Sequence, residues 1–131
     1  MKNKIFAFLT ALLALLIGCN SNTKIQQNLP SINVEQLSEK LETDSSLVLL
    51  DVRTEEEFDG PMGHLENAIL IPVQNIKDRY TELEGYKDKE IIVYCRSGNR
   101  SSKATSFLRE KGFNATNLEG GMIAWNKMHE K

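Results

Sequence analysis

Residues 90–112 have the sequence EIIVYCRSGNRSSKATSFLREKG, which places a strand, a loop and a helix in immediate succession. Glu90 to Tyr94 is a mostly apolar run, the pattern of a strand that is buried on both faces. The run leads into Cys95, and Ser101 to Lys111 has helical composition with Gly112 just beyond it. A buried strand that passes through a short loop into a helix is typical of α/β proteins.

The same alternation continues on both sides of this segment. Three further apolar runs predict strands over Leu47 to Val52, Ala68 to Ile71 and Ala115 to Leu118. Four further helices are predicted after the capping residue Asn33, after the capping residue Thr54, from Ile76 to Leu83 and around Trp125. Short apolar strands that alternate with helices predict a parallel sheet with helices on both faces, so the fold class is α/β.

The composition is that of one compact domain. The chain has 131 residues, of which 16 are Lys or Arg and 18 are Asp or Glu, and its formal net charge is −2. No basic surface argues for binding to nucleic acid, so we expect no such partner. Two cysteines cannot form a disulfide framework, and together with two histidines they lack metal-ligand spacing. We therefore expect neither a metal nor a cofactor.

The first residues are typical of a secretion signal. Lys2 and Lys4 precede an apolar run from Ile5 to Ile17, which is too short to span a bilayer comfortably but suits a signal peptide. The segment Leu16-Ile17-Gly18-Cys19 resembles the bacterial lipobox, in which the cysteine receives acyl groups such as palmitate. We expect a signal peptide over residues 1–18 and lipidation at Cys19. The alternatives are an ordinary signal peptide or an uncleaved anchor helix.

Residues 19–32 are polar, rich in Asn, Gln, Ser and Thr, and include Pro30. This composition predicts a flexible tether between the lipid and the folded domain. Since an acidic chain gains nothing from anionic phospholipids, we expect the lipid anchor alone to hold the protein at the membrane. The predicted location is the bacterial cell envelope, facing the periplasm or the cell surface.

The loop after the strand at Glu90 to Tyr94 carries the chemistry that we predict. Sites in parallel α/β sheets form at the carboxyl ends of strands, where Cys95 lies. Backbone N–H groups of such a loop, beside a helix N-terminus, form an anion cradle that lowers the pKa of a thiol. The alternative is an inert buried cysteine. The candidate site comprises Cys95 as nucleophile and, for substrate binding, Arg96, Ser97, Gly98, Asn99 and Arg100.

Four segments in order resemble the single-domain rhodaneses, a family of sulfurtransferases. They are Asp51-Val52-Arg53 with Glu57-Phe58; Gly63-His64-Leu65 with Asn67-Ala68 and Ile71-Pro72; the loop Cys95 to Ser101; and Leu118-Glu119-Gly120-Gly121 with Trp125. The resemblance identifies residues 33–131 as a rhodanese-like domain. Asn67 departs from the family, which more often has Gly there, and Pro61-Met62 are inserted before Gly63.

The resemblance implies a five-stranded parallel sheet, with a short first strand near residues 31–33, and a persulfide on Cys95. Sulfur would come from thiosulfate or a persulfide and would pass to a thiol acceptor. Arg96 and Arg100 would supply positive charge for an anionic donor; the alternative is that they are solvated surface residues without a role in binding. The expected partners are a small sulfur donor and a thiol acceptor, and we expect a monomer.

Other polar residues near the strand ends have simpler interpretations. Asp51, Arg53 and Glu57 are expected to form a structural set of ion pairs or hydrogen bonds. His64 is a possible general base, but it follows Gly63 in a turn, and exchange of sulfur between thiolates needs no proton abstraction. We therefore favour a structural role for His64.

Two other functions compete with sulfur transfer. One is a sulfur-carrier or partner-binding module with little turnover of its own. The other is a Cys-dependent phosphatase or arsenate reductase. In the phosphatases the arginine lies six positions after the cysteine, but here that position is Ser101 and the arginine is Arg100. A ring shorter by one residue favours a single sulfur atom over a phosphoryl group.

Overall fold

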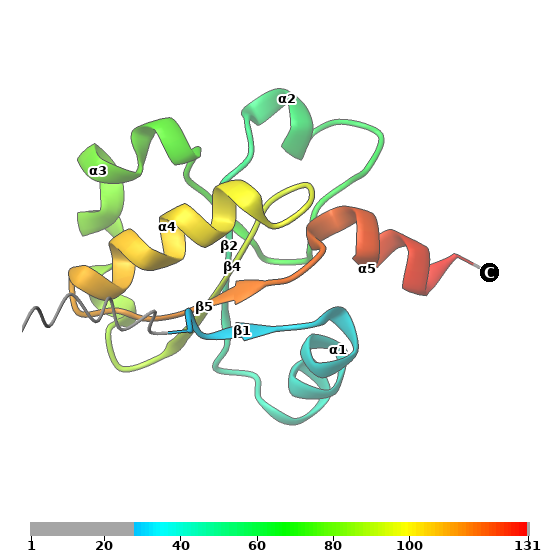
Figure 1. The fold of residues 1–131 in the computed structure, drawn as a ribbon, viewed down its shortest axis with the longest axis horizontal. Helices are drawn as coiled ribbons and strands as arrows, with labels where there is room; N and C mark the ends of the chain where they lie inside the picture. The colour runs from blue at the N-terminus through cyan, green and yellow to red at the C-terminus, as the bar shows by residue number, and fades with distance from the viewer. Residues whose placement is uncertain (1–27, 131) are drawn as a thin grey trace, which may run out of the picture.

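The computed structural model describes residues 28–130 as an α/β domain with a five-stranded sheet (Figure 1). The strands are β1 (Ser31–Ile32), β2 (Val48–Asp51), β3 (Ile69–Leu70), β4 (Glu90–Tyr94) and β5 (Asn114–Leu118). Their order across the sheet is β1-β5-β4-β2-β3, and every pairing is parallel. The predicted α/β class and the five-stranded parallel sheet are therefore confirmed.

The helices are α1 (Val34–Thr43), α2 (Glu55–Phe58), α3 (Ile76–Arg79), α4 (Asn99–Glu110) and α5 (Gly121–His129), with 3₁₀ turns at Val73–Asn75 and Tyr80–Tyr86. Asn33 and Thr54 each close a capping box at the start of α1 and α2, as the sequence predicts. The predicted helix from Ile76 to Leu83 is correct in place, but only its first turn is α-helical.

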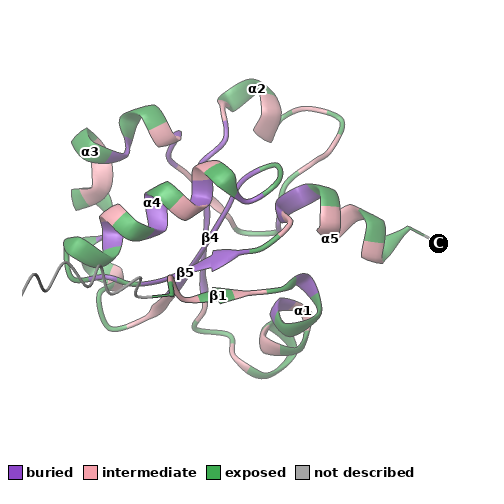
Figure 2. Cartoon of the chain, in the orientation of Figure 1, coloured by how far each residue is buried: buried purple, intermediate pink, exposed green. Residues whose placement is uncertain are grey.

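Helices cover both faces of the sheet because alternate residues of β4 point to opposite sides. Ile91 and Val93 belong to one core cluster, which includes Leu108 of α4. Ile92 and Tyr94 belong to the other, together with residues of α1 and α5. Figure 2 shows β4 and β5 in the buried colour through most of their length. The central strands are thus enclosed by side chains on both faces of the sheet.

Two observed boundaries differ from the predicted ones, and the second difference concerns the site. Strand β1 pairs with β5, so the folded domain begins before Asn33 and includes the end of the segment predicted as tether. Helix α4 begins at Asn99, not at Ser101, because Gly98 takes a left-handed conformation with φ of 108° and ends the loop there. Asn99 and Arg100 therefore lie in the first helical turn. The other predicted strands differ from the observed ones by one residue at some ends.

The predicted signal peptide and Cys19 lie outside the described residues, as does most of the predicted tether. Within residues 28–130, no helix combines the length and the apolar character that crossing a bilayer requires.

Candidate active site

Cys95 follows β4 directly and lies under the loop that leads into α4. The residue is 1% exposed, and its Sγ accepts a hydrogen bond of 3.1 Å from the backbone N–H of Gly98. The hydroxyl of Ser101 lies 3.4 Å from the same sulfur. The loop therefore curls around the thiol and directs donors at it, as an anion cradle does.

These donors change the acidity of the thiol. Burial by itself raises the pKa of Cys95, but hydrogen bonds from the Ser101 hydroxyl and from the backbone N–H groups of Ser101, Gly98 and Ser97 outweigh it. The net effect is a pKa below the ordinary value for cysteine. A lowered thiol pKa favours the thiolate, which is the nucleophilic form.

The N-terminus of α5 fixes the other side of the loop. The backbone N–H of Met122 donates to the carbonyl of Cys95 at 2.9 Å, and that of Ile123 donates to the carbonyl of Arg96 at 3.0 Å. A Cβ on Gly121 would overlap the same two carbonyl groups, so the close approach requires glycine. Gly121, the second glycine of the Gly120-Gly121 pair, thus allows α5 to bind the loop.

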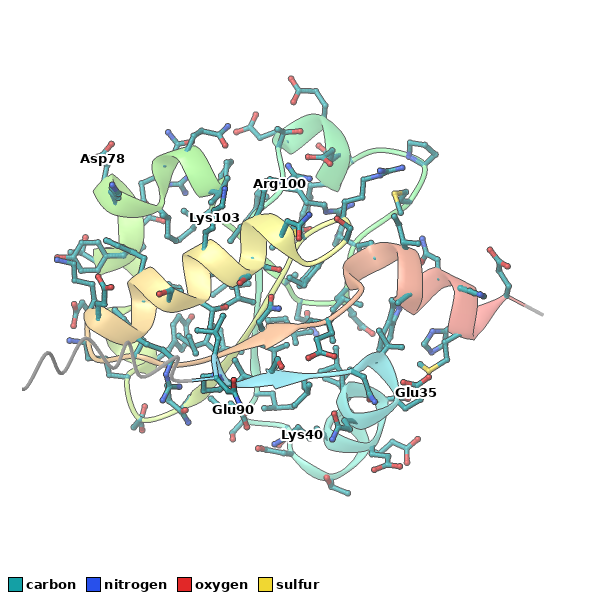
Figure 3. All side chains as sticks on the ribbon, in the orientation of Figure 1. Glu35, Lys40, Asp78, Glu90, Arg100 and Lys103 are labelled. Carbon is teal, nitrogen blue, oxygen red and sulfur yellow. The ribbon has the colours of Figure 1, made fainter. Side chains whose placement is uncertain are left out.

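Arg100 is bound to a carboxylate of α2. Its two terminal nitrogens donate to the two oxygens of Glu57 at 2.7 Å each, and Figure 3 shows Arg100 between the start of α4 and α2. The hydrogen bonds from Arg100 hold the pKa of Glu57 at about 2, and the same contact raises the pKa of Arg100. Since Glu57 balances its charge, Arg100 ties α4 to α2 in this structure.

Asp51 and Arg53 form a second, buried pair. Nη2 of Arg53 donates to Oδ2 of Asp51 at 2.7 Å and to the carbonyl of Gly63 at 2.7 Å. The side chains are 0% and 1% exposed. The predicted structural pairing is therefore correct for Asp51 and Arg53, whereas Glu57 joins Arg100 instead of this pair.

Arg96, Ser97 and Asn99 are exposed at the mouth of the loop. Arg96 also lines a cavity of about 260 Å³, together with Glu56 and with the inserted residues Pro61 and Met62. The insertion therefore lines the same cavity as Arg96, the residue that follows Cys95. In residues 28–130 neither Arg96 nor Glu56 takes part in an ion pair.

His64 has a structural environment. Its ring stacks on Phe58 with 3.6 Å between the ring centroids, and its Nδ1 lies 2.9 Å from the carbonyl oxygen of Phe58. Asn67 has a φ of 60°, a left-handed turn that asparagine tolerates, which explains why it can replace glycine there.

Sequence reasoning missed two residues of the site. Ser101 is 0% exposed, and its hydroxyl lies against the sulfur of Cys95, while Asn117 of β5 is 8% exposed and lies 2.7 Å from that hydroxyl. Ser101 is the last residue of the loop segment that carries the family resemblance, whereas Asn117 lies one residue before Leu118, where the last of those segments begins. What the sequence did not reveal was that their side chains point inward and meet.

No group of three or more His, Cys, Asp or Glu side chains within the described part of the chain is arranged to hold a metal ion. The arrangement around Cys95 is instead a buried thiol with hydrogen-bond donors, suited to nucleophilic attack on a sulfur atom.

A model of the rhodanese-like domain matches residues 33–128 of this chain. YtwF of Bacillus subtilis, which bears the name "Putative sulfurtransferase", is 42% identical over 94 residues, covering 72% of this chain and 87% of that protein. A sulfurtransferase of Allochromatium vinosum is 37% identical over 95 residues, covering 72% of this chain and 85% of that protein. YrkF of Bacillus subtilis, which bears the name "Putative sulfur carrier protein", is 31% identical over 109 residues, covering 82% of this chain and 57% of that protein.

A rhodanese-related protein from Thermoplasma volcanium has a similar solved structure. The TM-score is 0.69 at 33% sequence identity, and the match covers 78% of this chain and 95% of that one.

Proposed function

This chain belongs to the family of rhodanese-like domains, and on that premise we propose that it is a sulfurtransferase that carries sulfane sulfur as a persulfide on Cys95. The named sulfurtransferases among its relatives support a transferase. We propose thiosulfate or a persulfide as donor and a thiol as acceptor. The observation that carries the proposal is the buried Cys95 sulfur, which receives an N–H donor from Gly98 and lies beside the Ser101 hydroxyl.

In the first half of the reaction, the thiolate of Cys95 attacks the outer sulfur of thiosulfate. A bond forms between the two sulfurs, the bond within thiosulfate breaks, and sulfite leaves with the electron pair. The charge stays on the terminal sulfur of the new persulfide, about 2 Å beyond Sγ. The N–H group of Gly98, which donates to Sγ in this structure, belongs to the loop that would surround that charge.

In the second half, an acceptor thiolate attacks the terminal sulfur. The sulfur–sulfur bond on Cys95 breaks, the thiolate of Cys95 is regenerated, and the acceptor leaves as a persulfide. No proton has to move in either step once the attacking thiols are ionised. This agrees with the structural environment of His64, whose ring stacks on Phe58 and contacts its carbonyl oxygen.

The test is the mass of the protein after treatment with thiosulfate. We expect one sulfur to be added to the full chain at Cys95, as located by peptide mass spectrometry, and cyanide or a reductant to remove it. Cys95→Ser should abolish the adduct and the transfer of sulfur to cyanide while the protein stays folded. An adduct that survives this substitution would place the chemistry elsewhere.

A sulfur carrier that relays sulfur to a partner protein is the second candidate, supported by the similarity to YrkF. A carrier would form the same persulfide but would pass it on slowly to small thiols and cyanide. Single-turnover release of the Cys95 sulfur to a small thiol separates the two, since an enzyme releases it rapidly to a small thiol, whereas a carrier releases it slowly without its partner protein.

We further propose that Cys19 is lipidated and that the lipid attaches the domain, as a monomer, to the cell envelope. The support is the sequence Leu16-Ile17-Gly18-Cys19 after an apolar run. The expressed protein should partition into detergent, and Cys19→Ser should shift it to the aqueous or unprocessed fraction. A wild-type protein that stays aqueous and starts at another residue would contradict the proposal.

A further inference from the structure

The hydroxyl of Ser101 lies among three groups, each of which can accept a hydrogen bond from it. The Sγ of Cys95 lies at 3.4 Å, the carbonyl oxygen of Gly98 at 3.1 Å and Oδ1 of Asn117 at 2.7 Å. Ser101 is fully buried, so no bulk water takes part in this competition. The Gly98 carbonyl already accepts the backbone N–H of Ser102 at 3.0 Å and does not depend on the hydroxyl. The hydroxyl can therefore turn from the Gly98 carbonyl to Cys95 or to Asn117 without leaving that carbonyl unpaired.

The observed arrangement fits a protonated thiol. The shortest contact of the Ser101 hydroxyl is to the side-chain amide oxygen of Asn117, which can only accept, so while Cys95 is a thiol the hydroxyl proton points to Asn117 and not to the sulfur. The oxygen of Ser101 is then free to accept a hydrogen bond from the S–H group of Cys95. In this state the chain of donors runs from Cys95 through Ser101 to Asn117.

A thiolate at Cys95 reverses these requirements, since it can only accept. Ser101 must then donate to sulfur, and its oxygen needs a donor on the other side. A half-turn of the Asn117 amide about its Cβ–Cγ bond puts the NH₂ group where the oxygen was. Within residues 28–130 no protein group accepts a hydrogen bond from the Asn117 NH₂, so the rotation breaks none there.

We propose that Asn117 is a positioning residue whose amide turns over when Cys95 ionises, so that its NH₂ group donates to Ser101 and the Ser101 hydroxyl donates to the thiolate. The thiol proton itself leaves to water. Asn117 lies on β5 between β4 and β1, with its backbone N–H bound to the carbonyl of Pro30 at 2.8 Å. The strand is fixed, and only the side chain has to turn.

The inference rests on the proposed role of Cys95, but its test reads the ionisation of the thiol and not sulfur transfer. The rate of alkylation of Cys95 by iodoacetamide is measured between pH 5 and pH 10 on the full chain. Peptide mass spectrometry distinguishes Cys95 from Cys19. The midpoint of the rate profile is the apparent pKa of Cys95. Loss of one hydrogen bond to a charged group should move it by about one pH unit, or tenfold in rate below the midpoint.

The direction in which Asn117→Leu shifts the midpoint for Cys95 tests the proposal. If the amide turns and supports the thiolate, its removal raises the midpoint by about one pH unit. If Asn117 only competes for the Ser101 proton, its removal leaves the midpoint unchanged or lowers it, and the proposal is wrong. Asn114→Leu is the matched control, since it is the same substitution at an exposed position of the same strand, and we expect no shift.

Ser101→Ala completes the cycle. We expect it to raise the midpoint by at least as much as Asn117→Leu, because the donor to sulfur is lost. In the Ser101→Ala background Asn117→Leu should have no further effect, since Asn117 acts through the hydroxyl. Equal shifts in both backgrounds would mean that Asn117 acts on the thiol directly, and would overturn the proposal.

Thermal unfolding shows whether each variant is folded. Should Asn117→Leu fail to fold, Asn117→Ala replaces it, because the smaller side chain removes the amide without adding a charge. We expect that variant to raise the midpoint, with the rise at least halved in the Ser101→Ala background. An undiminished rise would contradict the relay. Failure to form a sulfur adduct in the wild type would refute the proposed function but would leave these alkylation results unaffected.

Discussion

Two strand-loop-helix units lie side by side in this domain, and the backbone N–H groups at their helix starts donate to different kinds of acceptor. Strand β4 leads to α4 and strand β5 leads to α5, and each helix follows a glycine with positive φ, Gly98 or Gly120. At the start of α4, the N–H of Gly98 points at the Cys95 sulfur. At the start of α5, the N–H groups of Met122 and Ile123 are used by the carbonyls of Cys95 and Arg96.

The two helix starts are also held by different forces. The start of α5 is bound to the loop through backbone hydrogen bonds, at a distance that admits no side chain on Gly121. The start of α4 is fixed through a side-chain ion pair, from Arg100 to Glu57, that is about one third exposed. The difference teaches that one unit carries the nucleophile, while the helix of its neighbour holds the loop in place through its backbone. It also separates the effects of mutations in the two units.

The largest effect should come from Gly121→Ala. The new Cβ would overlap the carbonyls of Cys95 and Arg96, and φ at this position is 53°, which disfavours side chains. Overpacking against backbone that cannot move, plus the left-handed strain, should reduce the free energy of unfolding by about 3 kcal/mol. Denaturant unfolding measures the loss, and alkylation of Cys95 measures the damage to the loop.

Gly85→Ala is the matched control for this prediction. A Cβ on Gly85 meets no atom within 4 Å, and the position has no positive φ. We expect its stability to stay within about 0.5 kcal/mol of wild type. A Gly121→Ala protein as stable as Gly85→Ala would show that α5 does not hold the loop in place.

The next effect should come from a glycine inserted between Gly98 and Asn99. The insertion moves the arginine to the sixth position after Cys95, the phosphatase spacing, and enlarges the ring around the sulfur. Loss of the Gly98 N–H contact to sulfur should lower the rate of sulfur transfer at least about tenfold. A glycine inserted between Lys87 and Asp88, exposed residues before β4, is the control and should leave transfer near wild type.

The activities of the wild-type protein also test whether the loop suits sulfur transfer or phosphate hydrolysis. We expect negligible hydrolysis of aryl phosphates beside measurable transfer of sulfur from thiosulfate to cyanide. Strong phosphatase activity in the wild type, lost in Cys95→Ser, would overturn the assignment as a sulfurtransferase.

The contrast between the two units marks how far the sequence could predict the structure. The buried strands and the capping boxes at Asn33 and Thr54 follow from local patterns, so the class and the position of Cys95 were predictable. The partner of Arg100 was not, because Glu57 lies 43 residues away in the sequence and only the fold brings the two together. The meeting of Ser101 with Asn117 is equally non-local.

The predicted start of α4 at Ser101 was wrong for a local reason. Asn99 and Arg100 are polar and follow glycine, which is typical of a loop, so composition extended the loop as far as Ser101. The left-handed φ of Gly98 ends the loop earlier, since the next residues can then enter the helix at once. A glycine in sequence shows that such a φ is possible but not that it is used.

The smallest effect should come from Glu57→Gln, which removes the charge from the pair that holds α4 but keeps the capping box at Thr54, since glutamine also caps. The pKa of Glu57 is about 2 in the folded protein against an ordinary value of 4.5, chiefly because of the hydrogen bonds from Arg100. Its contribution to stability is therefore complete above pH 4.5 and lost as the pH falls toward 2. Solvent screening limits the contribution to about 1 kcal/mol.

Denaturant unfolding of wild type and Glu57→Gln at pH 7, 4.5, 3 and 2 should show a difference that is constant down to about pH 4.5 and then disappears. Glu82→Gln is the matched control. It removes the partner of Arg79 from a pair whose side chains are 40% and 50% exposed, so its effect should be smaller at every pH. Gly121→Ala should lose the same free energy at pH 7 and pH 4.5, since its contacts carry no titrating group. An equal pH dependence in Glu57→Gln and wild type would mean that the ion pair does not hold the start of α4.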